Sequence, residues 1–176
     1  ILESIVYEFD ILMLKETRVD KIAFPGYTSY INPVSKTHHG QAILIKYDMP
    51  HTLLDVQKWD QEDREMQCIL ITVRGKQWKI VNIYVGNDSI KKPEDWGFLE
   101  ELLGERLLIC GDFNARGTRW GNINDNKQGR ALDQALMESD LIMLNCEKMT
   151  RLAPKKSDSD SNIDLALVSS FAETET

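Results

Sequence analysis

The sequence is short of several features that would define a functional class at once. Its three cysteines, Cys68, Cys110 and Cys146, lie far apart and form no Cys-x-x-Cys pair, so we expect neither a zinc site nor a thiol-redox motif. Their apolar surroundings favour buried, reduced thiols in an intracellular protein. No apolar run approaches the roughly 18 residues of a membrane span, and we expect no membrane partner.

Positive charge is also scarce. The 176 residues include 21 basic and 28 acidic side chains, which gives a formal net charge of −7. This excludes a globally basic protein that coats nucleic acid, but it allows a local basic groove. The length suits one domain with a sizeable core, and the 42% apolar and 28% charged residues are ordinary for a globular protein.

An initiator methionine and a secretory signal are missing as well. Ile1 opens inside an apolar-patterned stretch that has no basic segment or cleavage site. We therefore interpret Ile1 as a cut rather than a natural start. The chain has no internal repeat and no linker, so residues 1–176 are interpreted as one domain.

Apolar runs and turn signals predict many strands and few helices. We expect strands at residues 10–16, 27–31, 40–46, 51–57, 66–73, 77–84, 106–110, 141–144 and 162–168. Helical spacing predicts helices at 94–103 and 128–139, and 1–9 is interpreted as the end of another. Three successive strands joined by short turns indicate antiparallel pairing. The pattern predicts a single α+β domain.

A carboxylate stands at the end of one predicted strand, in the run LLICGDFN at residues 107–114. The strand is expected to stop at Gly111, which permits a tight backbone, and to place Asp112 at its exit. Asn114 lies on the same side if the chain stays extended. A carboxylate beside an amide can hold a water and a phosphate oxygen. The alternative is a plain Asp/Asn turn after a strand.

Two further carboxylates repeat this pattern. Glu16 ends the first predicted strand, and Asp164 lies within the last one. A charge in an apolar strand costs free energy unless it is paired or bound to a metal, and oxygen ligands of this kind suit Mg²⁺ or Mn²⁺. The alternatives are a solvated strand end for Glu16 and a loop-amide or arginine partner for Asp164. Tyr84 and Asn87 leave another strand end in the same way, although Tyr84 also fits a simple edge aromatic.

Taken together, these residues resemble one family. The motifs ETR at 16–18, IYVGN at 83–87, GDFN at 111–114 and SNID at 161–164 occur in the order of the endonuclease/exonuclease/phosphatase superfamily. The stretch GDFNARGTRWGN, followed later by a Ser-x-Ile-Asp-Leu strand, is similar to the apurinic-type endonuclease domain of non-LTR retrotransposons. The resemblance covers essentially the whole chain. It implies a four-layer α/β sandwich of two packed mixed β-sheets with outer helices.

The resemblance also implies a role for each motif residue. Glu16 matches a metal ligand, Asp112 the aspartate that orients or deprotonates the attacking water, and Asn114 the amide that holds the phosphate. Tyr84 and Asn87 match positions that contact the scissile phosphate. The implied reaction is hydrolysis of a DNA phosphodiester with Mg²⁺ (or Mn²⁺), which leaves a 3′-hydroxyl for a polymerase to extend.

Asp164 matches the aspartate that orients a catalytic histidine, a pairing that would fix the tautomer of the imidazole. Here the chain departs from the family. It begins after the strand that ends in a metal-site asparagine, and it stops before the family's final Asp-His strand. His38, His39 and His51 come too early to replace that histidine, and His38 and His39 are interpreted as loop residues. We therefore expect an incomplete domain that nicks no DNA by itself.

A locally basic segment follows Asp112. Residues 115–130 hold four basic side chains against one acidic, a net charge of +3. Arg116 and Arg119 are predicted to contact a phosphate backbone, with a solvated charged surface as the alternative. Trp120 either stacks on an exposed base or anchors its loop against the body of the domain.

The implied partners are a DNA substrate and a covalently linked reverse transcriptase domain, and the implied location is the nucleus. Two alternatives stay open. One is another phosphoesterase of the same superfamily, such as a phosphoinositide phosphatase or a deadenylase. The other is a catalytically dead remnant. The Trp-Gly pair after GDFNA favours the retrotransposon endonuclease.

Overall fold

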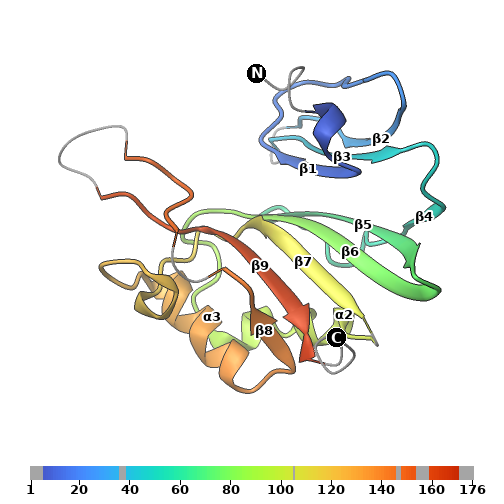
Figure 1. Ribbon diagram of the computed structural model, residues 1–176. Helices are drawn as coiled ribbons and strands as arrows, with labels where there is room; N and C mark the ends of the chain where they lie inside the picture. Colours follow the sequence, from blue (N-terminus) through green and yellow to red (C-terminus); the bar gives the residue numbers. More distant parts are fainter. Residues whose placement is uncertain (1–5, 36–38, 105, 146–147, 154–158, 171–176) are drawn as a thin grey trace.

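Two β-sheets packed face to face make up the body of the molecule (Figure 1). The computed structural model describes residues 6–35, 39–104, 106–145, 148–153 and 159–170. The smaller sheet has the order β1–β3–β2 and is antiparallel; its strands are β1 (Ile11–Lys15), β2 (Tyr27–Asn32) and β3 (Gln41–Lys46).

The larger sheet has six strands in the order β4–β5–β6–β7–β9–β8. These strands are β4 (His51–Leu54), β5 (Arg64–Val73), β6 (Lys76–Val85), β7 (Leu107–Asp112), β8 (Leu141–Met143) and β9 (Asp164–Ser169). The pair β6–β7 is parallel, whereas its neighbours β5–β6 and β7–β9 are antiparallel, so this sheet is mixed. The predicted antiparallel pairing of three successive strands is confirmed by β4, β5 and β6.

Helical segments cover the outer faces of the sheets. Figure 1 shows α2 and α3 beneath the larger sheet and the short N-terminal turn above the smaller one. The segments are η1 (Val6–Glu8), η2 (Pro93–Trp96), α2 (Phe98–Leu102), η3 (Thr118–Trp120) and α3 (Lys127–Met137). The predicted α/β sandwich of two sheets is confirmed, although its smaller sheet is antiparallel rather than mixed.

Each layer boundary has its own apolar cluster. Ile43 and Ile45 of β3 meet Ile69 and Ile80 of the larger sheet in the space between the sheets. A larger cluster on the opposite face of the six-stranded sheet includes Leu132 of α3. The central strands of the larger sheet therefore bury apolar side chains on both faces.

Two predicted helices differ from the structure. Residues 94–103 are divided into η2 and α2 at Gly97, whose N–H bonds the carbonyl of Glu94 in a 3₁₀ turn. A glycine at this junction favours the break because it is a poor helix former. Near the N-terminus the described helical turn is the three-residue η1, and residues 1–5 lie outside the described part.

The predicted strand end at Gly111 is wrong, because β7 continues through Gly111 to Asp112. A Cβ at Gly111 would overlap the carbonyl oxygen of Ile83 on the adjacent strand, so glycine is required by close packing and not by a turn. Asp112 therefore lies inside the sheet, in register with residues of both neighbouring strands.

Cys68 and Cys110 are free thiols, as expected, but only Cys68 is buried and Cys110 is half-buried; Cys146 lies outside the described residues. No helix in the described part of the chain is long and apolar enough to cross a membrane.

Candidate active site

Three candidate site residues form a row across the larger sheet. Tyr84 of β6 is in register with Asp112 of β7, and Asp112 is in register with Asp164 of β9. Side chains of paired residues point to the same face of a sheet, so the phenol and the two carboxylates stand side by side. They line a pocket of about 880 Å³ together with Glu16, Asn87, Asn114, Arg116, Thr150, Arg151, Ser159, Ser161 and Ile163.

Glu16 reaches this pocket from the other sheet. It follows β1 directly, and the hydroxyl of Tyr84 donates a hydrogen bond to its carboxylate. The backbone of Glu16 is left-handed, with φ 48°, a conformation that is uncommon outside glycine. Backbone bonds from Thr17 to Gly40 and from Arg18 to His39, both 3.0 Å from N to O, hold the next residues in place.

Asn114 is fixed on three sides. Its N–H donates to Oδ1 of Asp112 (2.8 Å), its Nδ2 donates to the carbonyl of Val85 (2.9 Å), and its own carbonyl accepts from Nδ2 of Asn126 (2.9 Å). Its φ of 47° is left-handed, so the expected extended chain between Asp112 and Asn114 is wrong. The turn nevertheless brings both side chains to the same pocket.

The environment of the pocket raises the pKa values of two of its residues, Asp112 and Tyr84. The pKa of Asp112 is raised to about 6, mainly by burial and in addition by the negative charges of Asp164 and Glu16, while the Asn114 N–H and Lys15 oppose the shift. Burial, followed by the charge of Glu16, raises the pKa of Tyr84 to about 12. At neutral pH Asp112 is therefore mostly ionised and Tyr84 is a hydrogen-bond donor.

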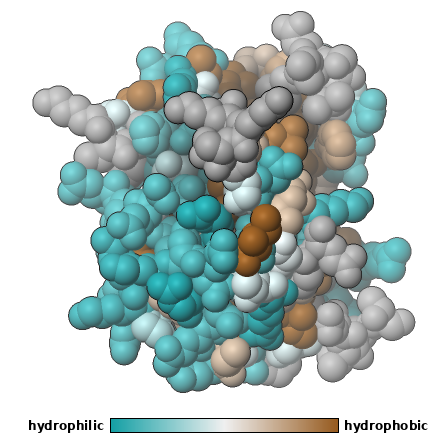
Figure 2. Space-filling model, turned by 90° about the vertical axis from the view of Figure 1, so that its left-hand side faces the viewer, coloured by the Kyte–Doolittle hydropathy of each residue, from teal (hydrophilic) through white to brown (hydrophobic). Residues whose placement is uncertain are grey.

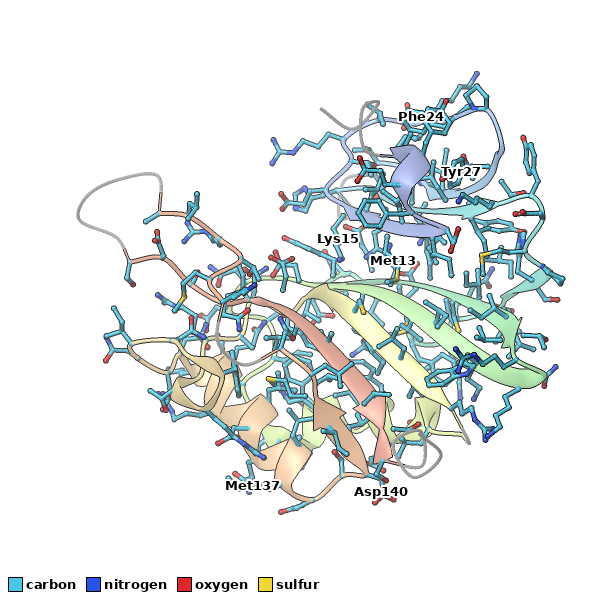
Figure 3. All side chains as sticks on the ribbon, in the orientation of Figure 1. Met13, Lys15, Phe24, Tyr27, Met137 and Asp140 are labelled. Atoms are coloured by element: carbon cyan, nitrogen blue, oxygen red, sulfur yellow. The ribbon has the colours of Figure 1, made fainter. Side chains whose placement is uncertain are left out.

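Lys15 is a site neighbour that the sequence reasoning missed. Figure 3 shows its side chain, like that of Met13, pointing from β1 toward the larger sheet. Burial lowers the pKa of Lys15, while the charges of Asp164, Cys110 and Asp112 act against this. Lys15 could have been predicted as a site neighbour from its position directly before Glu16 in an otherwise apolar strand.

The donor chemistry of the pocket fits a hard divalent cation. Within the described ranges, no three His, Cys, Asp or Glu side chains form a ready cage for a metal ion. Mg²⁺ does not require such a cage, because it is commonly held by one or two carboxylates and several waters. Glu16, Asp112 and Asp164 supply carboxylate oxygens of this type to one pocket.

The predicted DNA-contacting residues have different positions. Arg116 is exposed and lines the pocket, as Asn87 also does. Arg119 is not among the described residues that line the pocket, and its guanidinium donates to Asp133 at 2.9 Å, so the structure does not bring it to the pocket beside Arg116. Figure 2 views the molecule from the left-hand side of Figure 1, where β9 begins, and shows a largely hydrophilic surface.

Trp120 is not available to a base. Its side chain is 0% exposed, and its Nε1 donates to the carbonyl of Ala115 at 3.1 Å. Stacking requires a free ring face, so the base-stacking hypothesis is wrong. The alternative, that Trp120 anchors its loop to the body, is confirmed.

Three further residues lie near the candidate site residues, and two of them, Thr150 and His39, were not foreseen from the sequence. Thr150 and Arg151 line the pocket, and the Oγ1 of Thr150 accepts the N–H groups of Ile163 and Asp164. The ring of His39 lies edge-on to that of Tyr84, with 5.8 Å between the ring centroids. No local pattern signals these contacts, because each depends on the packing of distant segments. His38 lies outside the described residues.

Several solved structures share this fold. The endonuclease domain of TRAS1, a telomere-specific non-LTR retrotransposon, superimposes with a TM-score of 0.73 at 21% identity, over 96% of this chain and 76% of that one. The AP endonuclease LMAP from Leishmania major gives a TM-score of 0.68 at 12% identity, over 97% of this chain and 72% of that one. At these identities the two likenesses show that this chain has the fold of these nucleases.

Sequence comparison identifies the family. The endonuclease–reverse transcriptase family model matches residues 78–175, and the chain belongs to that family. The RNA-directed DNA polymerase from the mobile element jockey of Drosophila melanogaster is 22% identical over 135 residues, which is 74% of this chain and 14% of that protein. Its counterpart from Drosophila funebris is 19% identical over 171 residues, 94% of this chain and 18% of that protein. The chain thus spans less than a fifth of either relative. The predicted resemblance to retrotransposon endonuclease domains is confirmed.

Proposed function

We propose that, as part of its natural gene product, this chain cleaves phosphodiester bonds in DNA by hydrolysis that depends on Mg²⁺ or Mn²⁺. One observation carries the proposal. Glu16 from the smaller sheet and the row of Tyr84, Asp112 and Asp164 from the larger sheet line one pocket. Asn114 is held in that pocket by three hydrogen bonds. Carboxylates, a phenol and an amide are the groups that can bind a phosphate and align a water for attack.

In the proposed mechanism, Asp112 receives a proton from the attacking water or orients it. A base with a pKa of about 6 is mostly ionised at neutral pH yet basic enough to assist proton transfer. Tyr84 remains protonated and donates a hydrogen bond, while Asn114 and Asn87 contact the phosphate. Glu16 is the residue we assign to the divalent cation, which neutralises charge on the phosphate when bound.

The choice of DNA as substrate has separate support. Arg116 and Arg151 give the pocket two exposed cations. The similar proteins are an endonuclease domain of a retrotransposon and polymerases of mobile elements. We propose that a reverse transcriptase domain is linked to this chain and extends the 3′-hydroxyl left at the nick. We also place its function in the nucleus, which microscopy of the tagged protein tests.

The experiment is a nicking assay on supercoiled plasmid with the natural gene product that contains this chain. We expect Mg²⁺-dependent nicking that is lost in Asp112→Asn, since this substitution removes the ionised group but keeps the hydrogen bond to Asn114. A substrate panel runs in parallel. Phosphate release from an inositol phosphate that depends on Asp112, without DNA nicking, would assign the chain to a phosphatase instead.

The isolated 176 residues are expected to give no nicking above background. Among the described residues that line the pocket none is a histidine, so Asp164 has no imidazole to orient there. One such electrostatic group is commonly worth about 10²–10³ in rate. Strong nicking by the isolated chain that Asp112→Asn abolishes would refute this expectation.

A further inference from the structure

Gln128, in the first turn of α3, joins the two loops that carry the site amides. Its side chain is buried, with 1% of its surface exposed. Its Nε2 donates to the carbonyl oxygens of Gly86 (3.1 Å) and Phe113 (2.6 Å), and its Oε1 accepts the N–H of Ile90 (3.1 Å). One side chain therefore makes three hydrogen bonds, all to backbone.

The bonded positions lie next to the candidate site residues. Gly86 directly precedes Asn87, and Phe113 lies between Asp112 and Asn114. The two loops are more than twenty residues apart in the sequence, so their spacing depends on tertiary contacts. Gln128 supplies such a contact without lining the pocket itself.

The start of α3 is rigidly attached to the second of these loops. Asn126 caps the helix by accepting the N–H of Gly129 (2.6 Å), and the same oxygen accepts the N–H of Arg116 (3.0 Å). Its Nδ2 donates to the carbonyl of Asn114 (2.9 Å). A Cβ at Gly129 would overlap the carbonyl of Arg116, so helix and loop are in direct contact.

We propose that Gln128 is a positioning residue for the phosphodiester cleavage: it holds the Asn87 loop at a fixed distance from Asp112 and Asn114. The inference rests on the proposed function. A buried amide whose three bonds all go to backbone of functional loops has little freedom to move. Loss of its bonds lets the Asn87 loop shift, and a displacement of about 1 Å in such a site can lower the rate about 10²-fold.

The test compares two variants of the same helix in the whole natural gene product. Gln128→Met keeps the length of the side chain but removes its three hydrogen bonds. Leu132→Ala is the control, because it removes apolar packing of α3 from a fully buried position without a hydrogen bond to either loop. Both variants are assayed for plasmid nicking at a temperature where thermal melts show them folded.

We expect Gln128→Met to lower kcat about 10–100-fold while KM for DNA changes less than about threefold. Leu132→Ala should keep kcat within about threefold of the wild type despite a lower Tm. A kcat for Gln128→Met equal to the wild type, or an equal loss in both variants, would overturn the proposal, because the second result is what a merely structural role gives.

Amide hydrogen exchange of the same proteins separates this inference from the proposed function. Gln128→Met should increase exchange in residues 86–90 and 113–116, whereas Leu132→Ala should increase it mainly in α3. Absence of DNA nicking by the wild type would refute the proposed function but leave this comparison valid. Unchanged exchange of both loops in Gln128→Met would refute the positioning role whatever the activity.

Discussion

Asp112 and Asp164 face each other across the antiparallel pair β7–β9, so two carboxylates stand side by side in the sheet. After burial, the negative charge of Asp164 contributes most to raising the pKa of Asp112. Keeping two like charges together costs free energy, which a bound cation offsets. This relationship leads to the first two predictions, one on stability and one on activity.

We predict that Asp112→Asn stabilises the metal-free fold at pH 7.5 but not at pH 4. The folded-state pKa of about 6 lies above the reference value of 3.8, so between these values the folded state binds more protons than the unfolded state. Stability therefore falls as pH rises through this window. Urea denaturation should show a gain of about 1–3 kcal/mol at pH 7.5 and none at pH 4.

The control for this comparison is Asp133→Asn. Asp133 pairs with Arg119 at the surface, where such pairs contribute about 0–1 kcal/mol, so this variant should change stability little at either pH. A loss of stability in Asp112→Asn at pH 7.5 would contradict the assigned cost of the buried carboxylate.

The same carboxyl group predicts the pH dependence of cleavage. The rate kcat/KM should fall about tenfold per pH unit below about pH 6, because Asp112 is then protonated and cannot assist the water. Higher Mg²⁺ concentration should move this acid limb, the fall of kcat/KM at low pH, to lower pH, since a bound cation favours the ionised form of Asp112. Tyr84→Phe should keep the acid limb. A limb that lies near pH 4 at low Mg²⁺ would show that another group limits the reaction.

Much of the fold was predictable, because most strands of the larger sheet contain an apolar run bounded by turn residues. Glu16 and Asp112 were recognisable as charges at the ends of predicted strands and Asp164 as a charge within one, and the structure brings all three to one pocket. The reason for Gly111 was not predictable, since it depends on the approach of Ile83 from a neighbouring strand.

The loop after β7 shows where prediction from the sequence stops. In the sequence, Arg116 and Arg119 belong to the same basic segment and cannot be told apart. In the structure Arg119 pairs with Asp133 of α3, whereas Arg116 lines the pocket. In the same way, the burial of Trp120 and the contact of His39 with Tyr84 are set by tertiary packing. Local patterns locate groups capable of chemistry, whereas their contacts require the whole fold.

Arg116 and Arg119 provide a matched pair for DNA binding. We expect Arg116→Ala to weaken binding to a short duplex and to reduce the slope of log affinity against log salt by about 1, because this arginine lines the pocket. Arg119→Ala should leave the slope nearly unchanged, because its guanidinium is engaged by Asp133. Fluorescence anisotropy over a salt series measures both. Equal slopes for the two variants would contradict the proposed position of the DNA backbone.

Trp120 should act on stability and not on DNA binding. Its indole is fully buried, and a Cβ at Gly117 would overlap the ring, so the loop is packed closely around it. We expect Trp120→Ala to lower the free energy of unfolding by about 3–5 kcal/mol. Trp120→Phe, which keeps most of the apolar volume but loses the bond to Ala115, should cost about 1–3 kcal/mol.

The affinity of Trp120→Phe for single-stranded DNA decides whether Trp120 only anchors its loop or also stacks on a base. A tryptophan that only anchors its loop can be replaced by phenylalanine without loss of affinity, provided that the protein is folded at the assay temperature. Removal of a stacking partner would instead weaken binding by about 1–3 kcal/mol, or roughly 5–150-fold. Since the ring has no exposed face, we expect the affinity of Trp120→Phe to equal that of the wild type. A loss in that range would mean that the loop opens to present the indole to a base.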